Sequence, residues 1–239
     1  MKPLSKSEQL LKLGVPRRAA DRIAQASAER NAKGRFEFRA EADEAEILIY
    51  DFIGFDYFDE GMTAKRFYDE LQNVSDASSL RVRINSPGGD VWDGMAIYNM
   101  LVESQATTRV TIEGIAASAA SLIAMAGDTV EAYETSQIMI HDAWTIALGN
   151  EQELREIADT LEKIDGQIAD VYANKSGGDS QEFRRLMDEE TFATAKEARD
   201  LGIVDTVIEL AAGSKNSARS RNRAKVKIQI NKARLGLTA

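Results

Sequence analysis

The chain has 239 residues, of which 44% are hydrophobic and 29% are charged. This length and composition suit one α/β domain with extensions at its ends rather than two full domains. The absence of cysteine excludes a disulfide framework, a cysteine-ligated zinc and thiol catalysis, which leaves Ser, Thr, Lys, His and carboxylates to supply any chemistry. The N-terminal residues lack the apolar core of a signal peptide, and no segment approaches about 18 uninterrupted apolar residues. We therefore expect a soluble, cytoplasmic protein with no membrane span.

The net charge of −9 is unevenly distributed. Residues 213–239 hold eight Lys or Arg and no acid, which leaves the rest of the chain near −17. Because so acidic a body repels phosphates, we expect nucleic-acid contact to be at most weak and confined to the basic tail. The sequence thus predicts three parts: a polar, helical extension over 1–35, a folded domain over 36–212 and a basic, flexible tail over 213–239.

The predicted elements alternate between strand and helix along the chain. In the extension, helices are expected near Ser7–Lys12 and Arg17–Arg30. The apolar run 45–54 predicts a first strand, and residues 80–89 predict another that alternates apolar and arginine side chains before Pro-Gly-Gly. The remaining expected elements are helix 62–74, helix 91–103, strand 108–116, helix 118–127, two short strands within 129–143 and a long helix from about 150 to 172. This order favours stacked β-α units with right-handed crossovers and functional groups at strand ends.

The only histidine in the sequence, His141, limits the possible chemistry. It follows the apolar segment 136–140, at the point where a predicted strand enters a loop. Any serine activated by an imidazole must therefore use His141 as its base. A lone histidine that caps a strand or bonds a carbonyl gives the same pattern, so this residue alone does not establish catalysis.

Two further segments have the properties of a nucleophile and an oxyanion hole. Ser118 lies where a predicted strand becomes a helix, so its hydroxyl would lie near free N–H groups that favour negative charge. A plain helix cap explains the same serine. In Asn85–Asp90, NSPGGD, adjacent glycines can turn backbone N–H groups toward a ligand oxygen, although an ordinary turn has the same composition. Neither a Walker A motif nor G-x-G-x-x-G is present.

Four segments occur in order: INSPGGDVWDGMAIYNML, GIAASAASLIAMAG, IMIHDA and FATAKEARDLGIVD. Together they closely resemble the proteolytic subunit of the Clp protease family, over roughly Ile47 to Ile208. The segments INSPGGDV, AIYN, AASAASLIAMAGD and MDEETF look most like the phage and prophage branch, the Clp-related head maturation proteases. The resemblance implies an α/β fold of the stacked β-β-α type, a crotonase/Clp-protease-like spiral, with an extended handle helix.

The resemblance also implies catalytic roles. Ser118 matches the family's nucleophile, because it follows two alanines and lies nine residues before Gly127, and Ser121 is less suited. His141, after Met-Ile, matches the base. The oxyanion hole would take one N–H from the Gly88-Gly89 turn and one from Ala119.

The third triad member departs from the family pattern. The position two residues before Phe192, where the family usually has Asp, holds Glu190. Asp188 lies two residues further back, and either acid could orient His141. Position favours Glu190 and residue type favours Asp188, while Asp142 would point away from the neighbouring ring.

The implied protein is an ATP-independent serine endopeptidase that needs no metal or organic cofactor and assembles into a homo-oligomeric ring. The handle helix would carry an apolar stripe made of Leu154, Ile157, Leu161, Ile164 and Ile168. Peptide substrate would add as a strand beside INSPGG or the strand after Gly127.

The phage-like motifs imply cleavage of scaffold or capsid precursor proteins in a bacterial host cell, at phage proheads. The first alternative is a host-type degradative peptidase fed by an ATP-dependent unfoldase. Less favoured are a crotonase-like acyl-CoA enzyme and an inactive structural homologue, of which Glu190 would be a symptom.

Overall fold

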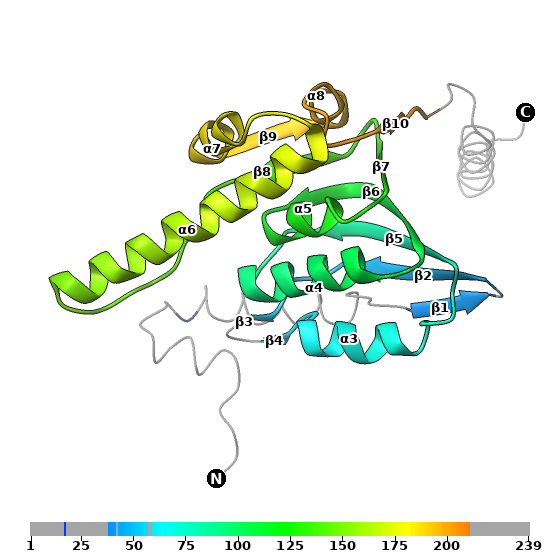
Figure 1. Cartoon of the computed structure of the whole chain (residues 1–239), viewed down its shortest axis with the longest axis horizontal. Helices are drawn as coiled ribbons and strands as arrows, with labels where there is room; N and C mark the ends of the chain where they lie inside the picture. The colour runs from blue at the N-terminus through cyan, green and yellow to red at the C-terminus, as the bar shows by residue number, and fades with distance from the viewer. Residues whose placement is uncertain (1–16, 18–37, 42, 57–58, 211–239) are drawn as a thin grey trace, which may run out of the picture. The chain divides into compact units, whose positions relative to one another are not determined.

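The computed structural model describes Arg17, 38–41, 43–56 and 59–210 (Figure 1). The two predicted N-terminal helices, Arg17 apart, and the basic tail lie outside the described residues. The chain divides into two compact units, Met1–Val207 and Ile208–Ala239, and the first holds the elements around the candidate site. None of the helices in the described part of the chain is both long and apolar enough to cross a membrane.

One mixed sheet forms the centre of the first unit. Its strands run in the order β1-β2-β5-β6-β7-β10, and β8 pairs with both β6 and β9. The central pairs β2 with β5, β5 with β6, and β6 with β7 or β8 are parallel, whereas β1 and β9 are antiparallel to their partners. The strand bounds are β1 (Phe38–Glu41), β2 (Glu44–Ile49), β5 (Ser79–Ser86), β6 (Thr107–Ala117), β7 (Thr129–Tyr133), β8 (Gln137–Ile140), β9 (Thr191–Thr194) and β10 (Thr206–Ile208). A separate short hairpin joins β3 (Phe55–Asp56) and β4 (Asp59–Glu60).

The predicted alternation of strand and helix is confirmed. In β5, Leu80, Val82 and Ile84 are buried as the alternating pattern requires. Arg83 points to the other face, where its guanidinium bonds Glu113 on β6 and Glu46 on β2. The three central strands are thus joined by apolar packing on one face and by charge pairing on the other.

Helices pack along one face of the parallel strands, as Figure 1 shows. They are α3 (Ala64–Gln72), α4 (Val91–Glu103) and α5 (Ala119–Ala124), followed along the chain by α6 (Glu151–Ser176), α7 (Ser180–Asp188) and α8 (Ala195–Asp200). The side chain of Asp90 begins α4 by accepting hydrogen bonds from the N–H groups of Trp92 and Asp93, both at 2.9 Å. The fold agrees with the expected stacked α/β type.

The first predicted strand is shorter than expected. It ends at Ile49 instead of Gly54, because Ile53 leaves the sheet and pairs with two loop segments. Its N–H donates to Gly88 O at 2.8 Å, and the neighbouring Gly54 N–H donates to Met62 O at 2.7 Å. Ile53 is fully buried there, so this apolar side chain packs beneath a loop and does not continue the strand.

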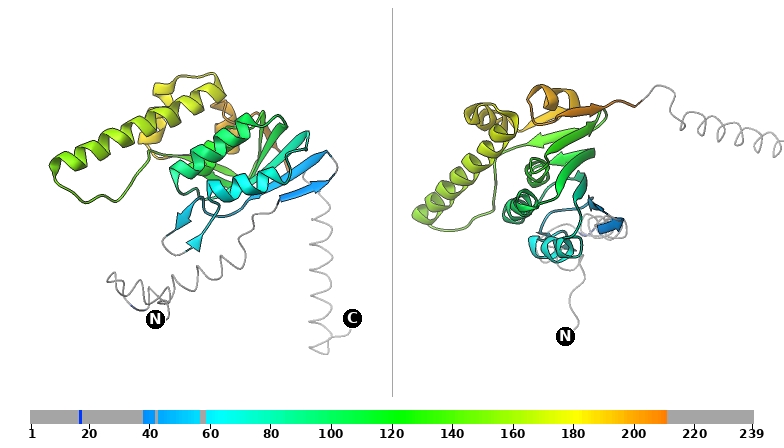
Figure 2. Two further views of the ribbon diagram at one scale, coloured as in Figure 1. Left: turned by 60° about the horizontal axis from the view of Figure 1, so that its bottom comes forward. Right: turned by 45° about the vertical axis from the view of Figure 1, so that its right-hand side comes forward.

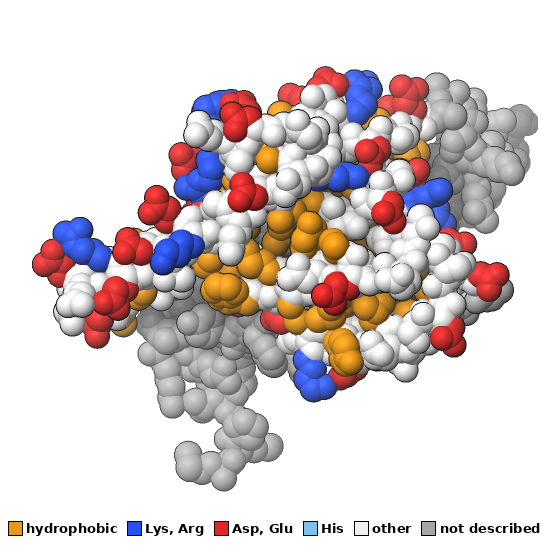
Figure 3. Space-filling model, viewed as in Figure 1, with side chains coloured by type: hydrophobic (Ala, Val, Ile, Leu, Met, Phe, Trp, Pro, Cys, Tyr) orange, Lys and Arg blue, Asp and Glu red, His pale blue; other side chains and the backbone are white. Residues whose placement is uncertain are grey.

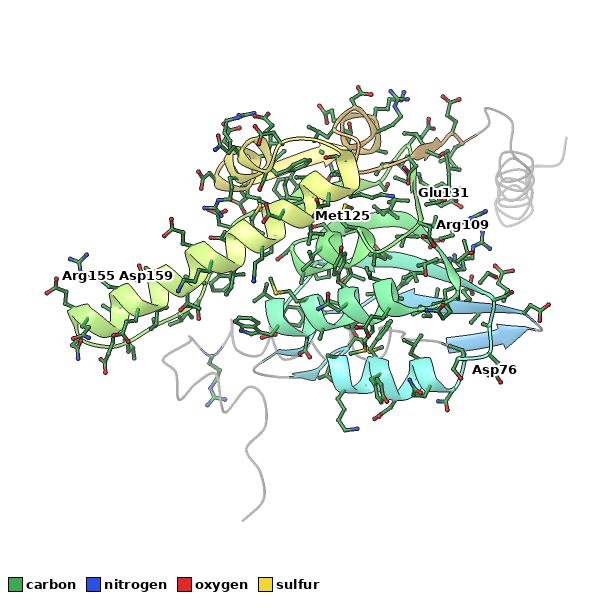
Figure 4. The ribbon with its side chains drawn as sticks, in the orientation of Figure 1. Asp76, Arg109, Met125, Glu131, Arg155 and Asp159 are labelled. Carbon is green, nitrogen blue, oxygen red and sulfur yellow. The ribbon has the colours of Figure 1, made fainter. Side chains whose placement is uncertain are left out.

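Helix α6 changes character along its length. Both views in Figure 2 show it running past the edge of the sheet. Ile164 and Ile168 are buried against the core, whereas Leu154 is 42% exposed. Hydrophobic side chains gather between α6, α5 and α4 (Figure 3), and Arg155 and Asp159 lie on the part of α6 beyond the sheet (Figure 4). The predicted apolar stripe is therefore core at one end of the helix and surface at the other.

Candidate active site

Ser118 occupies a strained turn between β6 and α5. Its backbone has φ 53° and ψ −127°, a region that residues with a Cβ rarely adopt. The N–H of Ser118 donates to Met139 O on β8 at 2.9 Å, which ties the turn to the neighbouring strand. Buried alanines on both sides, Ala117 and Ala119, leave room for the sharp change of direction. The turn presents the serine hydroxyl at the carboxyl end of β6.

His141 lies directly against this hydroxyl. Strand β8 runs parallel to β6 and ends at Ile140, so the next residue emerges at the same edge of the sheet. The Nε2 atom of His141 lies 2.8 Å from Ser118 Oγ, and the imidazole is half-buried. The structure therefore brings together the serine and the histidine that the sequence paired.

The Gly88-Gly89 turn packs against the same serine. Gly88 has φ 89° and Gly89 has φ 150°, both in the region that favours glycine. A Cβ on Gly88 would lie 2.7 Å from Ser118 Cβ and 3.0 Å from Ala119 N, so only glycine allows this approach. The Gly88 N–H donates to Ser86 Oγ at 3.1 Å. Within the described residues, the N–H groups of Gly89 and Ala119 have no acceptor, which leaves these two free to bind an anionic oxygen.

The two candidate acids take different positions beside His141. The β8–β9 ladder ends at the pair of Ile140 and Thr191, so His141 and Glu190 are the residues that lie just beyond this end of the ladder. Glu190 has φ 51° and is exposed, and it makes the turn from α7 into β9. Asp188 is the last residue of α7, and its carboxyl interacts with that of Asp142. Neither acid forms a hydrogen bond with the imidazole among the interactions of the described residues.

A charged cluster follows His141, and two of its members were missed in the sequence. Arg184 Nη1 lies 3.3 Å from Asp142 Oδ1 and 3.3 Å from Asp165 Oδ2. Asp165 is buried and accepts a hydrogen bond from Ala143 N at 2.7 Å, so the cluster fixes the chain just after the histidine. Burial and the carboxylates of Asp188 and Asp165 raise the pKa of Asp142 to about 6, although Arg184 opposes the shift. An aspartate next to Ile164 in an apolar stripe was the available signal for Asp165.

Ser121, the second serine of the alanine-rich segment, is fully buried. Its hydroxyl lies 2.6 Å from Ser118 O and 2.7 Å from the hydroxyl of Tyr172. The side chain is thus occupied inside the core, which agrees with the expectation that Ser121 is the less suited nucleophile.

The expected substrate edges are not free edges in this chain. Strand β5 lies between β2 and β6, and β7 lies between β6 and β10. Both strands are therefore hydrogen-bonded on two sides, so the prediction of strand addition at either one is wrong for the paired part of the strand. Of the segment INSPGG, only the turn after Ser86 lies beyond the last pair of the ladder between β5 and β6.

A parallel sheet that presents a serine and an imidazole in hydrogen-bond contact beside free backbone N–H groups is suited to nucleophilic hydrolysis. Comparisons with known proteins agree with this class. The family model described as Clp protease matches residues 58–211. The chain belongs to the Clp protease family.

Individual relatives also support membership of the Clp protease family. The chain is 35% identical over 139 residues to an ATP-dependent Clp protease proteolytic subunit from Pleurastrum terricola, covering 57% of this chain and 71% of that protein. It is 33% identical over 133 residues to the protein of the same name from Oltmannsiellopsis viridis, covering 55% and 68%. Among solved structures, a variant of ClpP1 from Listeria monocytogenes matches with a TM-score of 0.60 and 24% identity, covering 70% of this chain and 92% of that one. The last comparison supports the fold, and the family match favours a peptidase over a crotonase-like enzyme.

Proposed function

We propose that this protein is a serine endopeptidase of the Clp proteolytic-subunit type, with Ser118 as nucleophile and His141 as general base. The observation that carries the proposal is the 2.8 Å contact between Ser118 Oγ and His141 Nε2 at the edge of the sheet. The structural alternatives were that Ser118 only caps a helix and that His141 only caps a strand. Neither alternative requires the two side chains to contact each other. The strained backbone of Ser118 adds support, because such strain concentrates at functional sites.

In the proposed reaction, His141 Nε2 takes the proton from Ser118 Oγ while the oxygen attacks a peptide carbonyl. The N–H groups of Gly89 and Ala119 bind the oxyanion that forms. The imidazolium then gives its proton to the leaving amine, and a water activated by the same histidine releases the acyl group from the serine. No step consumes ATP or requires a metal.

Glu190 is the acid we assign to orient His141. It directly precedes Thr191, whose partner Ile140 directly precedes His141 in the last pair of the β8–β9 ladder, whereas the Asp188 carboxyl interacts with Asp142. A glutamate there can accept a hydrogen bond from the second ring N–H and stabilise the imidazolium in the transition state.

We also propose that copies of the chain assemble into a ring, because the segment before α6 exposes large apolar side chains. Trp144, Ile146 and Leu148 are 73%, 77% and 95% exposed. Large apolar side chains left in water over a continuous segment are typical of an interaction surface. We propose that this surface, with the exposed end of α6, contacts other copies of the chain.

Two biological roles fit this chemistry. The motifs shared with head maturation proteases favour cleavage of scaffold or capsid precursors at proheads in the bacterial cytoplasm. Both relatives are named as proteolytic subunits of an ATP-dependent Clp protease, which favours the alternative of a degradative peptidase fed by an ATP-dependent unfoldase. Incubation with scaffold protein alone, and separately with a tagged folded protein, an unfoldase and ATP, distinguishes them: cleavage without ATP supports maturation, and cleavage that requires the unfoldase supports degradation.

The catalytic assignment is tested by labelling with a fluorophosphonate, followed by peptide mass spectrometry. We expect one adduct on Ser118, lost in Ser118→Ala and His141→Ala. Glu190→Gln should slow the labelling, and the matched acid variant Asp188→Asn should label at the wild-type rate. An adduct on another residue, or undiminished labelling without His141, would contradict the proposal.

A further inference from the structure

The carbonyl of Ser118 is held by three donors from the first turn of α5. It accepts hydrogen bonds from the N–H groups of Ser121 and Leu122, at 2.9 and 3.2 Å, and from the Ser121 hydroxyl at 2.6 Å. The peptide bond that follows Ser118 is trans, so its N–H, which belongs to Ala119, points opposite to this carbonyl. Fixing the carbonyl therefore fixes the direction of the Ala119 N–H beside the nucleophile.

The direction of the hydrogen bonds around Ser121 can be assigned. A serine hydroxyl has one proton, and Ser118 O can only accept, so the Ser121 proton lies on that bond. The second bond, of 2.7 Å, must then be donated by the hydroxyl of Tyr172 to Ser121 Oγ. Burial raises the pKa of Tyr172, which keeps its hydroxyl protonated.

This chain of hydrogen bonds is sealed from water. Ser121 is 0% exposed and Tyr172 is 2% exposed, and the Tyr172 ring stacks on Phe183 with the centroids 5.6 Å apart. Tyr172 lies on α6, 51 residues from Ser121 in the sequence. Consecutive hydrogen bonds in a low-dielectric interior polarise one another, so electron withdrawal at Ser118 O strengthens the N–H of the same peptide as a donor.

We propose that Ser121 and Tyr172 are positioning residues for the oxyanion hole. The sequence of bonds from Tyr172 to Ser121 to the Ser118 carbonyl orients and polarises the peptide that carries the Ala119 N–H. The inference rests on the proposed peptidase function and adds a role for two buried hydroxyls that do not touch substrate. Because an oxyanion forms only in the transition state, loss of either hydroxyl should lower kcat and leave KM unchanged.

The test uses Tyr172→Phe, Ser121→Ala, the double variant and a matched control, Ser136→Ala. Ser136 is also a buried serine, 1% exposed, that donates to a carbonyl three residues earlier, but it lies outside the site. Each protein is assayed with a fluorogenic peptide for kcat and KM, and with a peptide aldehyde whose tetrahedral adduct occupies the oxyanion hole. Active-site titration with the fluorophosphonate normalises every rate to competent sites, and thermal unfolding records stability separately.

We expect kcat and aldehyde affinity to fall by about five- to tenfold in each single variant, the effect of one lost hydrogen bond, with KM unchanged. The double variant should lose little more than the larger single loss, because the two hydroxyls act through one carbonyl. The Ser136→Ala control should keep wild-type kcat whatever its stability.

The experiment distinguishes failure of this inference from failure of the proposed peptidase function. If the wild type is labelled at Ser118 while both variants keep wild-type kcat and aldehyde affinity per titrated site, the inference is wrong and the peptidase function stands. A loss of kcat equal to that of Ser136→Ala would also overturn it, because the effect would then be general to buried serines. If the wild type itself is not labelled at Ser118, the proposed function fails, and the inference fails with it.

Discussion

Replacement of Gly88 by alanine tests how closely the glycine turn approaches Ser118, the proposed nucleophile. The new Cβ would lie 2.7 Å from Ser118 Cβ and 3.0 Å from Ala119 N, so the turn or the serine must move. The positive φ of 89° costs an alanine about 1–2 kcal/mol, and the overpacking adds about 1–3 kcal/mol, so we expect a loss of about 2–5 kcal/mol in the free energy of unfolding. The proposed peptidase activity should fall by about a hundredfold or more, because displacement of Ala119 N or of the turn would remove a proposed oxyanion donor.

Gly177→Ala is the matched control for this prediction. Gly177 ends α6 with φ 70°, and a Cβ there would meet nothing within 4 Å, so only the backbone cost of about 1–2 kcal/mol applies. Urea unfolding gives the stability of both variants, and kcat/KM per titrated site gives their activity. If Gly88→Ala kept near wild-type kcat/KM, or if its stability loss equalled that of Gly177→Ala, the close approach of the turn to Ser118 would be refuted.

Three further predictions concern charge, assembly and the core. Asp142→Asn should stabilise the protein at pH 8 and not at pH 4, as measured by thermal unfolding. The pKa of Asp142 in the native state is about 6, above its ordinary value of 3.8, so ionisation of Asp142 disfavours the native state above pH 6. A stability difference between variant and wild type that is the same at both pH values would contradict this assignment. The side chain of Leu148 is 95% exposed in one chain, so Leu148→Asp should shift the sedimentation profile toward monomer if this side chain lies at a contact between copies. An unchanged profile would exclude Leu148 from such a contact. Ile168→Ala should lower the free energy of unfolding in urea by about 2–4 kcal/mol, and Leu154→Ala should lower it by less than about 1 kcal/mol. Equal losses would refute the change from core to surface along α6.

The order of strands and helices was predictable because each element has a strong local signal. Alternation in β5 and the caps of α4 and α6 follow directly from the residue pattern. The pairing of Ser118 with His141 was also within reach, since the chain has one histidine and the resemblance gave the matching serine.

Contacts between distant segments were not predictable in this way. Ile53 continues the apolar run of the first strand, but backbone pairing with Gly88 draws it out of the sheet. The partner of the buried Ser121 hydroxyl is Tyr172 on a helix that the sequence marks only as amphipathic. The choice between Glu190 and Asp188 likewise depends on the end of a strand ladder and on the partner of Asp188, which no local pattern contains.

The positive φ of Ser118 has a consequence for the trade between stability and activity. Glycine adopts this backbone region without the steric cost that a Cβ incurs. The position of the proposed nucleophile is therefore one where glycine would stabilise the folded state. Ser118→Gly should therefore unfold at a higher temperature than Ser118→Ala, although both variants lack the proposed nucleophile. The difference between their unfolding temperatures measures the strain held at the turn. Strain of this kind lowers the free energy of unfolding, so at this turn the proposed catalytic role of Ser118 and the stability of the fold favour different residues.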